Sequence, residues 1–344
     1  MKFLGYEVNG YVVAASCPAT ECIENVVKCA ENGAQAVILK SASSSRTNDG
    51  KKRRCYIDYE KKQFWSESGF DREMLLIDEA VELTKSAKLR TGILIIPSVC
   101  ELTYDTKQWV ETCKRLENAG ADALQLDFFY FNDMLCEDGL KEKMITLLKA
   151  VMNELSIPIM PKVNHNLPAS YIAKIFREAG VKYVSLLDSV RSVLPNNPIF
   201  EGKSLSVFGE WMFPLTKQYT KILVDSGFEV CAGGGVTNGS MAAELVELGA
   251  STVQIAMEIL LNGYARFSEI EKECKQCMQK MDRHRNSHFI ENRKASVNLS
   301  KCTGCGRCKV QCFCNVAKDL VNDNTQCEGC GLCADICKSG AITI

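Results

Sequence analysis

Two groups of cysteines near the end of the chain have a spacing that suits metal chemistry. The sequence contains 19 cysteines, and eight of them form two copies of one pattern. The copies are Cys302-x2-Cys305-x2-Cys308-x3-Cys312 and Cys327-x2-Cys330-x2-Cys333-x3-Cys337. Thiolates at this spacing are ligands of cubane iron–sulfur clusters. The sequence therefore predicts two 4Fe-4S clusters, whose chemistry is the transfer of single electrons.

The order of these cysteines predicts how the two clusters share them. In the run typical of bacterial ferredoxins, three consecutive cysteines hold one cluster and the fourth binds the other. The expected ligand sets are Cys302, Cys305, Cys308 and Cys337 for one cluster, and Cys327, Cys330, Cys333 and Cys312 for the other. Zinc ribbons use two CxxC pairs on separate knuckles, so two zinc sites are the weaker alternative. The proline usual after the fourth cysteine is replaced by Phe313 and Lys338, which removes no ligand.

The overall composition is that of a globular protein in a reducing compartment. The chain has 344 residues, of which 46% are hydrophobic and 24% charged, so it is too apolar for a disordered protein. Its net charge of −1 gives no general attraction for nucleic acid or an anionic membrane. The N-terminus lacks the apolar core of a signal peptide, and no apolar run is long enough to span a membrane. We expect a cytoplasmic metalloprotein without a nucleic-acid or membrane partner.

The first 265 residues alternate short apolar runs with amphipathic stretches, which is the pattern of βα units. The expected strands are Tyr11–Ser16, Ala36–Lys40, Gly92–Ile96, Ala123–Phe128, Ile159–Val163, Tyr183–Leu187, Glu229–Ala232 and Thr252–Ala256. Glycines that supply left-handed caps follow four of the helical stretches, at Gly33, Gly120, Gly180 and Gly249. Eight strands favour an α/β fold of the (β/α)8 TIM-barrel type over an open sheet. The expected domains are this barrel at 1–265, a helical linker at 266–297 and a small ferredoxin-like domain with two clusters at 298–344.

In such a barrel the active site lies at the C-terminal ends of the strands. The residues expected there are Ser16, Lys40, Ser98, Asp127, Lys162, Asp188, Gly233–Gly235 and Ala256. Two lysines at the ends of buried strands, with a glycine triplet after the seventh strand, indicate a bound phosphorylated cofactor. We expect the amides of Gly234 and Gly235, with a helix that begins near Asn238, to hold the phosphate.

Several segments of the barrel resemble the flavin domain of dihydroorotate and dihydropyrimidine dehydrogenases. The matching segments are Ala14-Ala15-Ser16, Gly33-Ala34 leading to Lys40, Ser68-Gly69-Phe70, Ala119–Leu124, Pro158–Lys162, Gly233–Val236 and Val253-Gln254-Ile255. The resemblance covers nearly all of residues 1–265, and a barrel followed by a two-cluster module is similar to the catalytic end of dihydropyrimidine dehydrogenase. It implies FMN as the cofactor. The positions that would contact FMN are Ala15, Ser16, Lys40, Lys162, Gly209, Gly234, Gly235, Ala256 and Met257.

The positions that would face the substrate depart from the family pattern. The family has asparagine after the fourth strand and a catalytic cysteine or serine in the loop that follows, whereas this chain has Asp127 and, in the catalytic position, Tyr130. The remaining substrate positions implied by the resemblance are Ser66, Asn132, Asp188 and Ser189. Tyr130 and Cys136 are the alternative proton-transfer residues, and Lys162 is the third catalytic candidate. A phenol can act as a general acid but is a poor base at neutral pH.

These residues predict a flavin oxidoreductase that acts on a C=C or CH–CH bond of a small substrate. The two clusters would exchange electrons with an outside partner, either an NAD(P)H-oxidising flavoprotein subunit or a soluble ferredoxin or flavodoxin, because the chain has no G-x-G-x-x-G motif of its own. Carboxylates only accept hydrogen bonds, so Asp127 and Asp188 favour a nitrogen-containing substrate with N–H donors over orotate, uracil or thymine. If Lys162 or the backbone occupies both carboxylates, this preference disappears. The alternatives are an ordinary dihydropyrimidine dehydrogenase catalytic subunit, or an electron-transfer or scaffold subunit with a non-catalytic barrel; a homo-oligomer is compatible with each.

Overall fold

The computed structural model describes residues 1–44, 54–61, 63–67, 74–101, 103–128, 139–187, 189–194, 204–286, 294–312, 314–320 and 323–344. Contacts divide the chain into two units, Met1–Gln279 and Lys280–Ile344. None of the helices in the described part of the chain is both long enough and apolar enough to cross a membrane.

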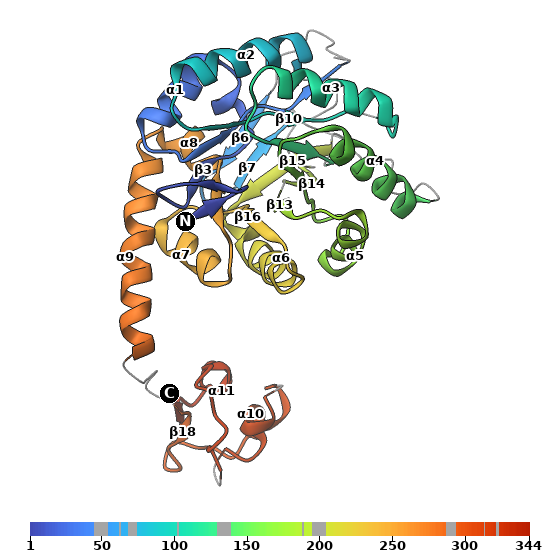
Figure 1. Cartoon of the computed structure of the whole chain (residues 1–344). Coiled ribbons are helices and arrows are strands. Elements are labelled where there is room, and N and C mark those ends of the chain that lie inside the picture. Colours follow the sequence, from blue (N-terminus) through green and yellow to red (C-terminus); the bar gives the residue numbers. More distant parts are fainter. Residues whose placement is uncertain are drawn as a thin grey trace. The chain divides into compact units, whose positions relative to one another are not determined.

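The first unit is built on a ring of parallel strands (Figure 1). Around the ring these are β3 (Val12–Ala14), β4 (Ala36–Ile38) continued by β5 (Ala42–Ser43), β9 (Leu94–Ile96) continued by β10 (Ser98–Val99), β11 (Leu124–Asp127), β12 (Ile159–Lys162), β13 (Tyr183–Ser185), β16 (Glu229–Gly233) and β17 (Thr252–Ile255). Pro97, which has no amide hydrogen, separates β9 from β10. Because β9 pairs with β4, β10 with β11 and β17 with β3, the eight strands of the described chain close into a barrel. This confirms the predicted fold class.

Helices follow the strands and cover the outside of the barrel (Figure 1). They are α1 (Ile23–Glu31), α2 (Ile77–Arg90), α3 (Thr106–Asn118), α4 (Leu140–Glu154), α5 (Ala169–Ala179), α6 (Phe213–Asp225), α7 (Gly239–Glu247) and α8 (Met257–Asn262). The predicted capping glycines have positive φ angles, 96° at Gly33, 93° at Gly120, 86° at Gly180 and 102° at Gly249. Each therefore adopts the left-handed conformation that ends a helix and lets the chain enter the next buried strand.

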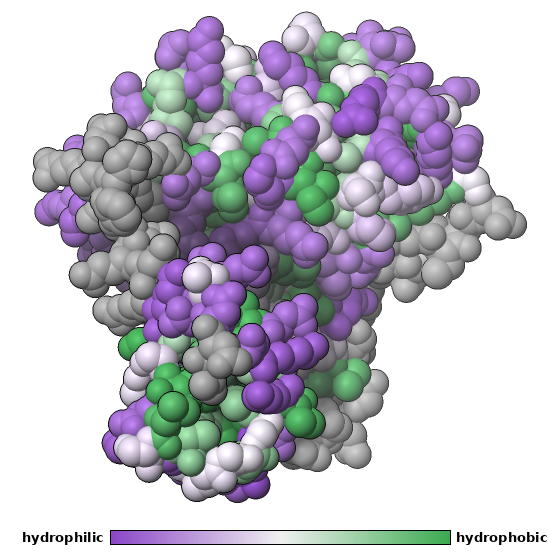
Figure 2. All heavy atoms as spheres, turned by 90° about the horizontal axis from the view of Figure 1, so that it is seen from below, coloured by the Kyte–Doolittle hydropathy of each residue, from purple (hydrophilic) through white to green (hydrophobic). Residues whose placement is uncertain are grey.

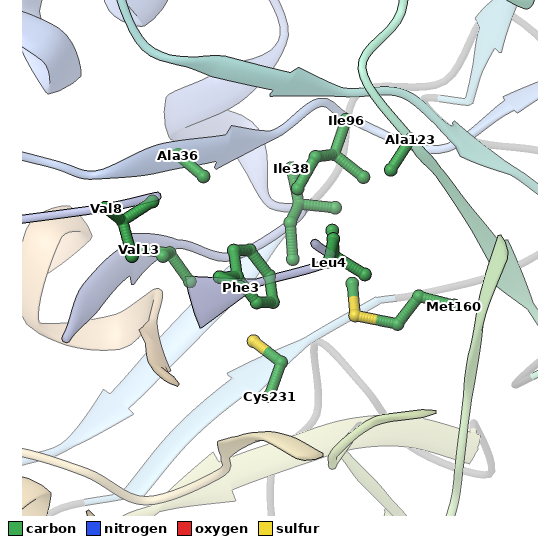
Figure 3. Close-up of a cluster of buried hydrophobic side chains, with 10 residues drawn as sticks. All are labelled: Phe3, Leu4, Val8, Val13, Ala36, Ile38, Ile96, Ala123, Met160 and Cys231. Carbon is green, nitrogen blue, oxygen red and sulfur yellow. The ribbon is translucent and has the colours of Figure 1, made fainter. Parts of the chain in front are cut away.

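A hairpin at the start of the chain closes the N-terminal end of the barrel. Its strands are β1 (Lys2–Phe3) and β2 (Tyr6–Glu7). Phe3 and Leu4 are each 1% exposed and lie at the centre of a cluster of side chains from the surrounding strands (Figure 3). The Leu4 amide donates to Glu229 Oε1 over 2.8 Å, which fixes the hairpin to the start of β16. In the described part of the barrel, the hairpin thus fills the N-terminal end and leaves the C-terminal end open.

A second sheet is formed by loops that leave the C-terminal end of the barrel. It is antiparallel and contains, in spatial order, β14 (Val190–Val193), β15 (Ser204–Gly209), β7 (Gln63–Ser66) and β6 (Cys55–Asp58). The short strand β8 (Leu75–Leu76) pairs beside β5. Phe64 and Phe208 are opposite each other across β7 and β15, and their rings stack with centroids 4.8 Å apart. These loops thus form an ordered wall above the barrel.

A long helix, α9 (Arg266–Asn286), follows the barrel, and as far as Gln279 it belongs to the first unit. Phe267, Ile270 and Cys274 are fully buried. Glu271 Oε2 accepts from the amides of Tyr11 at 2.8 Å and Val12 at 2.9 Å, so the helix is fixed to the first barrel strand. The boundary predicted at residue 265 precedes this helix.

The second unit contains two short helices that each begin directly after a left-handed glycine. α10 (Arg307–Val310) follows Gly306 and α11 (Leu332–Ile336) follows Gly331. A 3-10 turn, η4 (Asn315–Lys318), and an antiparallel pair of β18 (Ser296–Val297) and β19 (Ile342–Thr343) complete the unit.

On the face of the molecule drawn in Figure 2, hydrophilic residues predominate and hydrophobic residues gather in smaller patches between them.

Candidate functional site

The C-terminal end of the barrel contains a cavity of about 560 Å³. This volume is within the ~300–1,000 Å³ typical of cofactor and small-molecule sites. All nine residues predicted to contact FMN line it, namely Ala15, Ser16, Lys40, Lys162, Gly209, Gly234, Gly235, Ala256 and Met257. Three of the predicted substrate residues, Ser66, Asp127 and Ser189, line the same cavity. The structure therefore brings together the predicted cofactor positions and these substrate positions.

The glycines after β16 pack too closely against neighbouring segments to carry a side chain. A Cβ atom on Gly234 would lie 2.8 Å from Thr216 Oγ1, and one on Gly235 would lie 2.7 Å from the Gly209 carbonyl oxygen. Their φ angles are 115° and 78°, which residues other than glycine rarely adopt. Thr216 Oγ1 donates to the Gly234 carbonyl over 2.7 Å and so supports the loop from below. This backbone cradle, free of side chains, fits a phosphate group.

The helix that follows these glycines begins with an amide that already has a hydrogen-bond partner. Asn238 caps α7 by accepting from the Met241 amide at 3.0 Å, and the Gly239 amide donates to Glu273 Oε2 over 2.8 Å. Because Glu273 belongs to α9, this carboxylate occupies the end of α7 where an anion would bind. The part of the helix near Asn238 in the expected phosphate site therefore stays a prediction, and the Gly239 amide is already taken by Glu273.

Two buried cations face the same cavity. Lys40 is 7% exposed and Lys162 is 8% exposed. Lys162 Nζ is 4.0 Å from Asp127 Oδ2. Positive charges at this depth suit the developing negative charge on a reduced flavin ring. With the glycine cradle, they make the residues of this cavity a fit to FMN.

Burial suppresses the reactivity of the thiol beside these lysines. Cys17 lines the cavity, and desolvation raises its pKa to about 11, although the charges of Lys40 and Lys162 act in the opposite direction. The thiol is therefore protonated at neutral pH and is a poor nucleophile. Its role here is to pack beside the lysines.

Asp127 is positioned by the hydroxyl group of Ser41, a residue that sequence reasoning did not single out. Ser41 Oγ donates to Asp127 Oδ2 over 3.0 Å and lies 3.0 Å from Ser98 Oγ and 3.3 Å from Ser16 Oγ. Asp127 is 3% exposed, yet it lines the cavity. The carboxylate is thus held by Ser41 and by the nearby Lys162, while remaining at the cavity surface.

The hydrogen bonds continue across the barrel interior beneath the cavity. Gln125 Nε2 donates to Ser98 Oγ over 2.9 Å, Ser185 Oγ donates to Gln125 Oε1 over 2.9 Å, and Gln254 Nε2 donates to Ser185 Oγ over 2.8 Å. The available sequence signal was a glutamine in the middle of each of two apolar strands, β11 and β17. A satisfied buried network of this kind fixes the floor of a site.

The predicted substrate side is described only in part. Ser66 and Ser189 are 6% and 7% exposed, and Cys55 Sγ donates to Ser66 Oγ over 3.6 Å. Four further candidates lie outside the described residues, namely Tyr130, Asn132, Cys136 and Asp188. The identity of the proton-transfer residue therefore stays a prediction.

In the second unit several cysteines lie close enough to influence one another's titration, while the division into ligand sets stays a prediction. Cys312 and Cys333 are buried, and Cys327 lies close enough to Cys333 to affect its titration. The pKa of Cys333 is raised by burial and by the charges of Cys312 and Cys327, which are all members of one predicted set. Cys337 likewise acts on Cys305, a member of the other set.

Hydrogen-bond donors surround several of these sulfurs. The Arg307 amide and the Thr303 hydroxyl lower the pKa of Cys305, and the Ser339 hydroxyl and the Ala341 amide lower that of Cys337. The Ala295 amide donates to Cys327 Sγ over 3.2 Å. Among the described residues no three metal-ligating side chains converge on one ion, and a cubane does not require this, because each cysteine binds a different iron. Sulfur donors with this support fit iron–sulfur clusters.

A barrel with a cofactor-sized cavity at its C-terminal end, joined to a cysteine-rich unit, defines an iron–sulfur oxidoreductase class. Residues 320–343 match a family model described as a 4Fe-4S binding domain. The match includes the second cysteine run and not the first, so it shows 4Fe-4S binding without fixing the number of clusters.

The chain is homologous to dihydropyrimidine and dihydroorotate dehydrogenase subunits. It is 22% identical to the NAD-dependent dihydropyrimidine dehydrogenase subunit PreA of Escherichia coli, over 100% of the chain and 94% of that protein. It is 24% identical to the dihydroorotate dehydrogenase B (NAD(+)) catalytic subunit of Thermoplasma volcanium, over 70% of the chain and 80% of the relative. The dihydropyrimidine dehydrogenase (NADP(+)) of Arabidopsis thaliana is 24% identical, over 54% of the chain and 49% of its own length.

Proposed function

We propose that the chain is an FMN- and iron–sulfur-dependent oxidoreductase that acts on a C=C or CH–CH bond of a small nitrogen-containing substrate. One observation carries the proposal: the glycine cradle and the two buried lysines line a single cavity at the C-terminal end of the barrel. The homology to dihydropyrimidine and dihydroorotate dehydrogenases supports both the cofactor and the reaction class. The 4Fe-4S domain on the same chain supports electron transfer to a second protein.

Different residues of the cavity bind the cofactor and enclose the place where the substrate reacts. FMN, when bound, supplies two-electron chemistry toward the substrate and one-electron chemistry toward the clusters. Gly234 and Gly235 would hold the phosphate, while Lys40 and Lys162, which line the same cavity, would place positive charge beside the flavin ring. Phe64 and Phe208 form an apolar wall that restricts water. The cysteines of the second unit hold two 4Fe-4S clusters in the two sets proposed above.

The electrons must come from, or pass to, another protein. The relatives with the greatest coverage are named as subunits, which implies a second chain in each of those enzymes. We propose that this chain also works with an electron partner, either an NAD(P)H-oxidising flavoprotein subunit or a ferredoxin or flavodoxin.

Asp127 is the residue that bears most directly on the substrate. A carboxylate offers only acceptors, and one donor, Ser41, already satisfies part of Oδ2. A substrate group beside it must therefore donate, as an amine, amidine or N–H group does. Uracil, thymine or orotate would place carbonyl oxygens against lone pairs where the family has asparagine. A second candidate, an ordinary dihydropyrimidine dehydrogenase subunit, is favoured by the names of the relatives.

Reoxidation of the reduced flavin distinguishes these substrates. We expect anaerobically reduced protein to be reoxidised slowly by uracil, thymine and orotate, which carry carbonyl oxygens beside their N–H groups. It should be reoxidised rapidly by a conjugated C=C compound that presents an amine or amidine group to Asp127 in place of a carbonyl oxygen. Asp127→Asn should weaken the true substrate by about 10- to 100-fold, since one mispaired buried group costs about 1–3 kcal/mol. Its flavin content should not change, and Asp225→Asn, on the exposed end of α6, is the matched control.

Other outcomes of this experiment assign the alternatives. Rapid reoxidation by uracil, thymine or orotate would establish the pyrimidine assignment. A flavin-loaded protein that no C=C compound reoxidises would indicate an electron-transfer or scaffold subunit with a non-catalytic barrel.

A further inference from the structure

The two cysteine runs of the second unit carry opposite charges. Around the first run the charged residues are Lys301, Arg307 and Lys309, and no acidic residue occurs between Lys294 and Lys318. Around the second run the acidic residues are Asp319, Asp323, Glu328 and Asp335, and Lys338, directly after Cys337, is the single cation between Asp319 and Ile344. A charged partner protein is therefore attracted to the surface around one run and repelled by the surface around the other.

The ligand set that begins the first run is the more exposed of the two sets. In it Cys302 and Cys305 are exposed, and Cys308 and Cys337 are half-buried. In the other set Cys330 is exposed and Cys327 is half-buried, but Cys312 and Cys333 are buried. Lys301 and Lys309, beside the first run, are also exposed, and Arg307 is half-buried. An electron can pass to another protein most readily where the sulfur ligands reach the surface.

Two apolar side chains flank the exposed run. Leu299, three residues before Cys302, is 66% exposed, and Val310, at the end of α10, is 85% exposed. Transient electron-transfer complexes bury small interfaces, and an apolar centre with a charged rim is the usual composition of a docking patch. Leu299, Val310, Lys301, Arg307 and Lys309 together provide both parts, and we call these five residues the basic patch.

We propose that the basic patch is the docking surface for a one-electron carrier protein with an acidic face, of the flavodoxin or ferredoxin class. The charge complementarity identifies the occupant: three cations around exposed cluster ligands attract an acidic carrier and repel a basic one. The acidic residues of the second run, Asp323, Glu328 and Asp335, orient the unit by repelling the same carrier from the wrong side.

The inference rests on the proposed function, and its redox step is a transfer of one electron per encounter. A reduced carrier loses one electron and this chain gains one. Two successive encounters supply two electrons, which with two protons from water saturate one C=C bond. In the opposite direction the same two electrons leave through two oxidised carriers.

The test uses the full-length holoprotein and an acidic flavodoxin as the probe. Binding of the oxidised flavodoxin is measured by titration calorimetry, and electron transfer from its reduced form by stopped-flow absorbance, both from ~0.02 to ~0.5 M salt. We expect the affinity and the bimolecular rate constant to fall at least about tenfold across this salt range, because dissolved ions screen the attraction between the three cations and the acidic carrier. The double variant Lys301→Glu/Lys309→Glu should lose at least about tenfold in both quantities at low salt.

A matched variant separates docking from net charge. Lys294→Glu makes the same kind of charge reversal in the same unit, but Lys294 lies against the Thr325 carbonyl near the second run. It should change both quantities less than about twofold. The visible spectrum of each variant reports whether its clusters are intact, so a loss of binding with intact clusters supports the docking surface.

Three results would overturn the proposal. One is a binding affinity that responds neither to salt nor to the double variant, and another is an equal effect of Lys294→Glu. The third is dissociation of a homo-oligomer by the double variant in sedimentation, which would assign the patch to a second copy of the chain. If the purified protein contains no flavin or no labile sulfide, the proposed function is contradicted. That result is distinct from a failure of the docking surface, which is judged on protein with intact cofactors.

Discussion

Replacement of Gly235 with alanine is expected to lower the affinity for FMN by at least about 30-fold. The new Cβ would lie 2.7 Å from the Gly209 carbonyl oxygen and 2.9 Å from the Phe213 nitrogen, both of them backbone atoms that cannot rotate away. The left-handed φ of 78° adds about 1–2 kcal/mol of strain. Overpacking costs about 1–3 kcal/mol more, so the loop must shift to relieve the clash, and restoring its shape to bind the phosphate then costs this energy again. Each ~1.4 kcal/mol of that cost corresponds to a tenfold loss of affinity. The measurement is fluorescence titration of FMN into flavin-depleted protein.

Gly180 provides the matched control for this substitution. Its φ of 86° imposes a similar strain, but a Cβ there would meet nothing within 4 Å. Gly180→Ala should therefore lower the free energy of unfolding slightly and leave FMN affinity within about twofold of the wild type. Equal FMN affinity in the Gly235 variant and the wild type would show that the cradle does not hold the cofactor.

Cys305→Ala is expected to remove one of the two clusters and leave FMN bound. Iron and acid-labile sulfide should each fall from about eight to about four per chain, because a cubane that loses one of its four thiolates is not retained. Flavin should stay, since Cys305 belongs to the second unit and the cavity to the first. Electron transfer to an outside carrier should fall by at least about 100-fold if this cluster faces the partner.

Two comparisons make this result specific. Cys314→Ala changes the same residue type in the same unit but lies outside both runs, so iron content should be unaltered. Cys337→Ala should remove the same cluster as Cys305→Ala, so that the double variant loses no more iron than either single one. If Cys337→Ala instead adds to the loss in Cys305→Ala, the crossed ligand sets are incorrect.

Much of the barrel could be predicted because its signals are local. Each of the eight predicted strands overlaps an observed one, and the glycine caps appear where buried parallel strands need them. The ends of those strands converge by geometry, so Lys40, Asp127 and Lys162 could be expected at one cavity before any contact was known. Cysteine spacing is an equally local signal. Accordingly, glycines with left-handed φ angles lie between the cysteines of both predicted runs, at Gly304, Gly306, Gly329 and Gly331.

The features that sequence reasoning missed depend on contacts between distant segments. The Ser41 hydroxyl reaches Asp127, 86 positions further along the chain, and nothing in the local sequence of Ser41 indicates this bond. Glu273 occupies the end of α7 from a helix that the sequence presented as a linker. The antiparallel sheet above the cavity joins β7 to β15, which belong to separate loops of the barrel. Such pairings follow from the closed fold and not from any periodicity.

The cofactor content of anaerobically purified protein tests the central claim most directly. Flavin released by heat is identified and counted by chromatography, and iron, acid-labile sulfide and zinc are measured on the same sample. The account predicts about one FMN per chain with about eight iron and eight sulfide, and an absorbance spectrum that combines flavin and cluster bands. Stoichiometric zinc with no labile sulfide, or a barrel that binds no FMN when the flavin is added back, would contradict it.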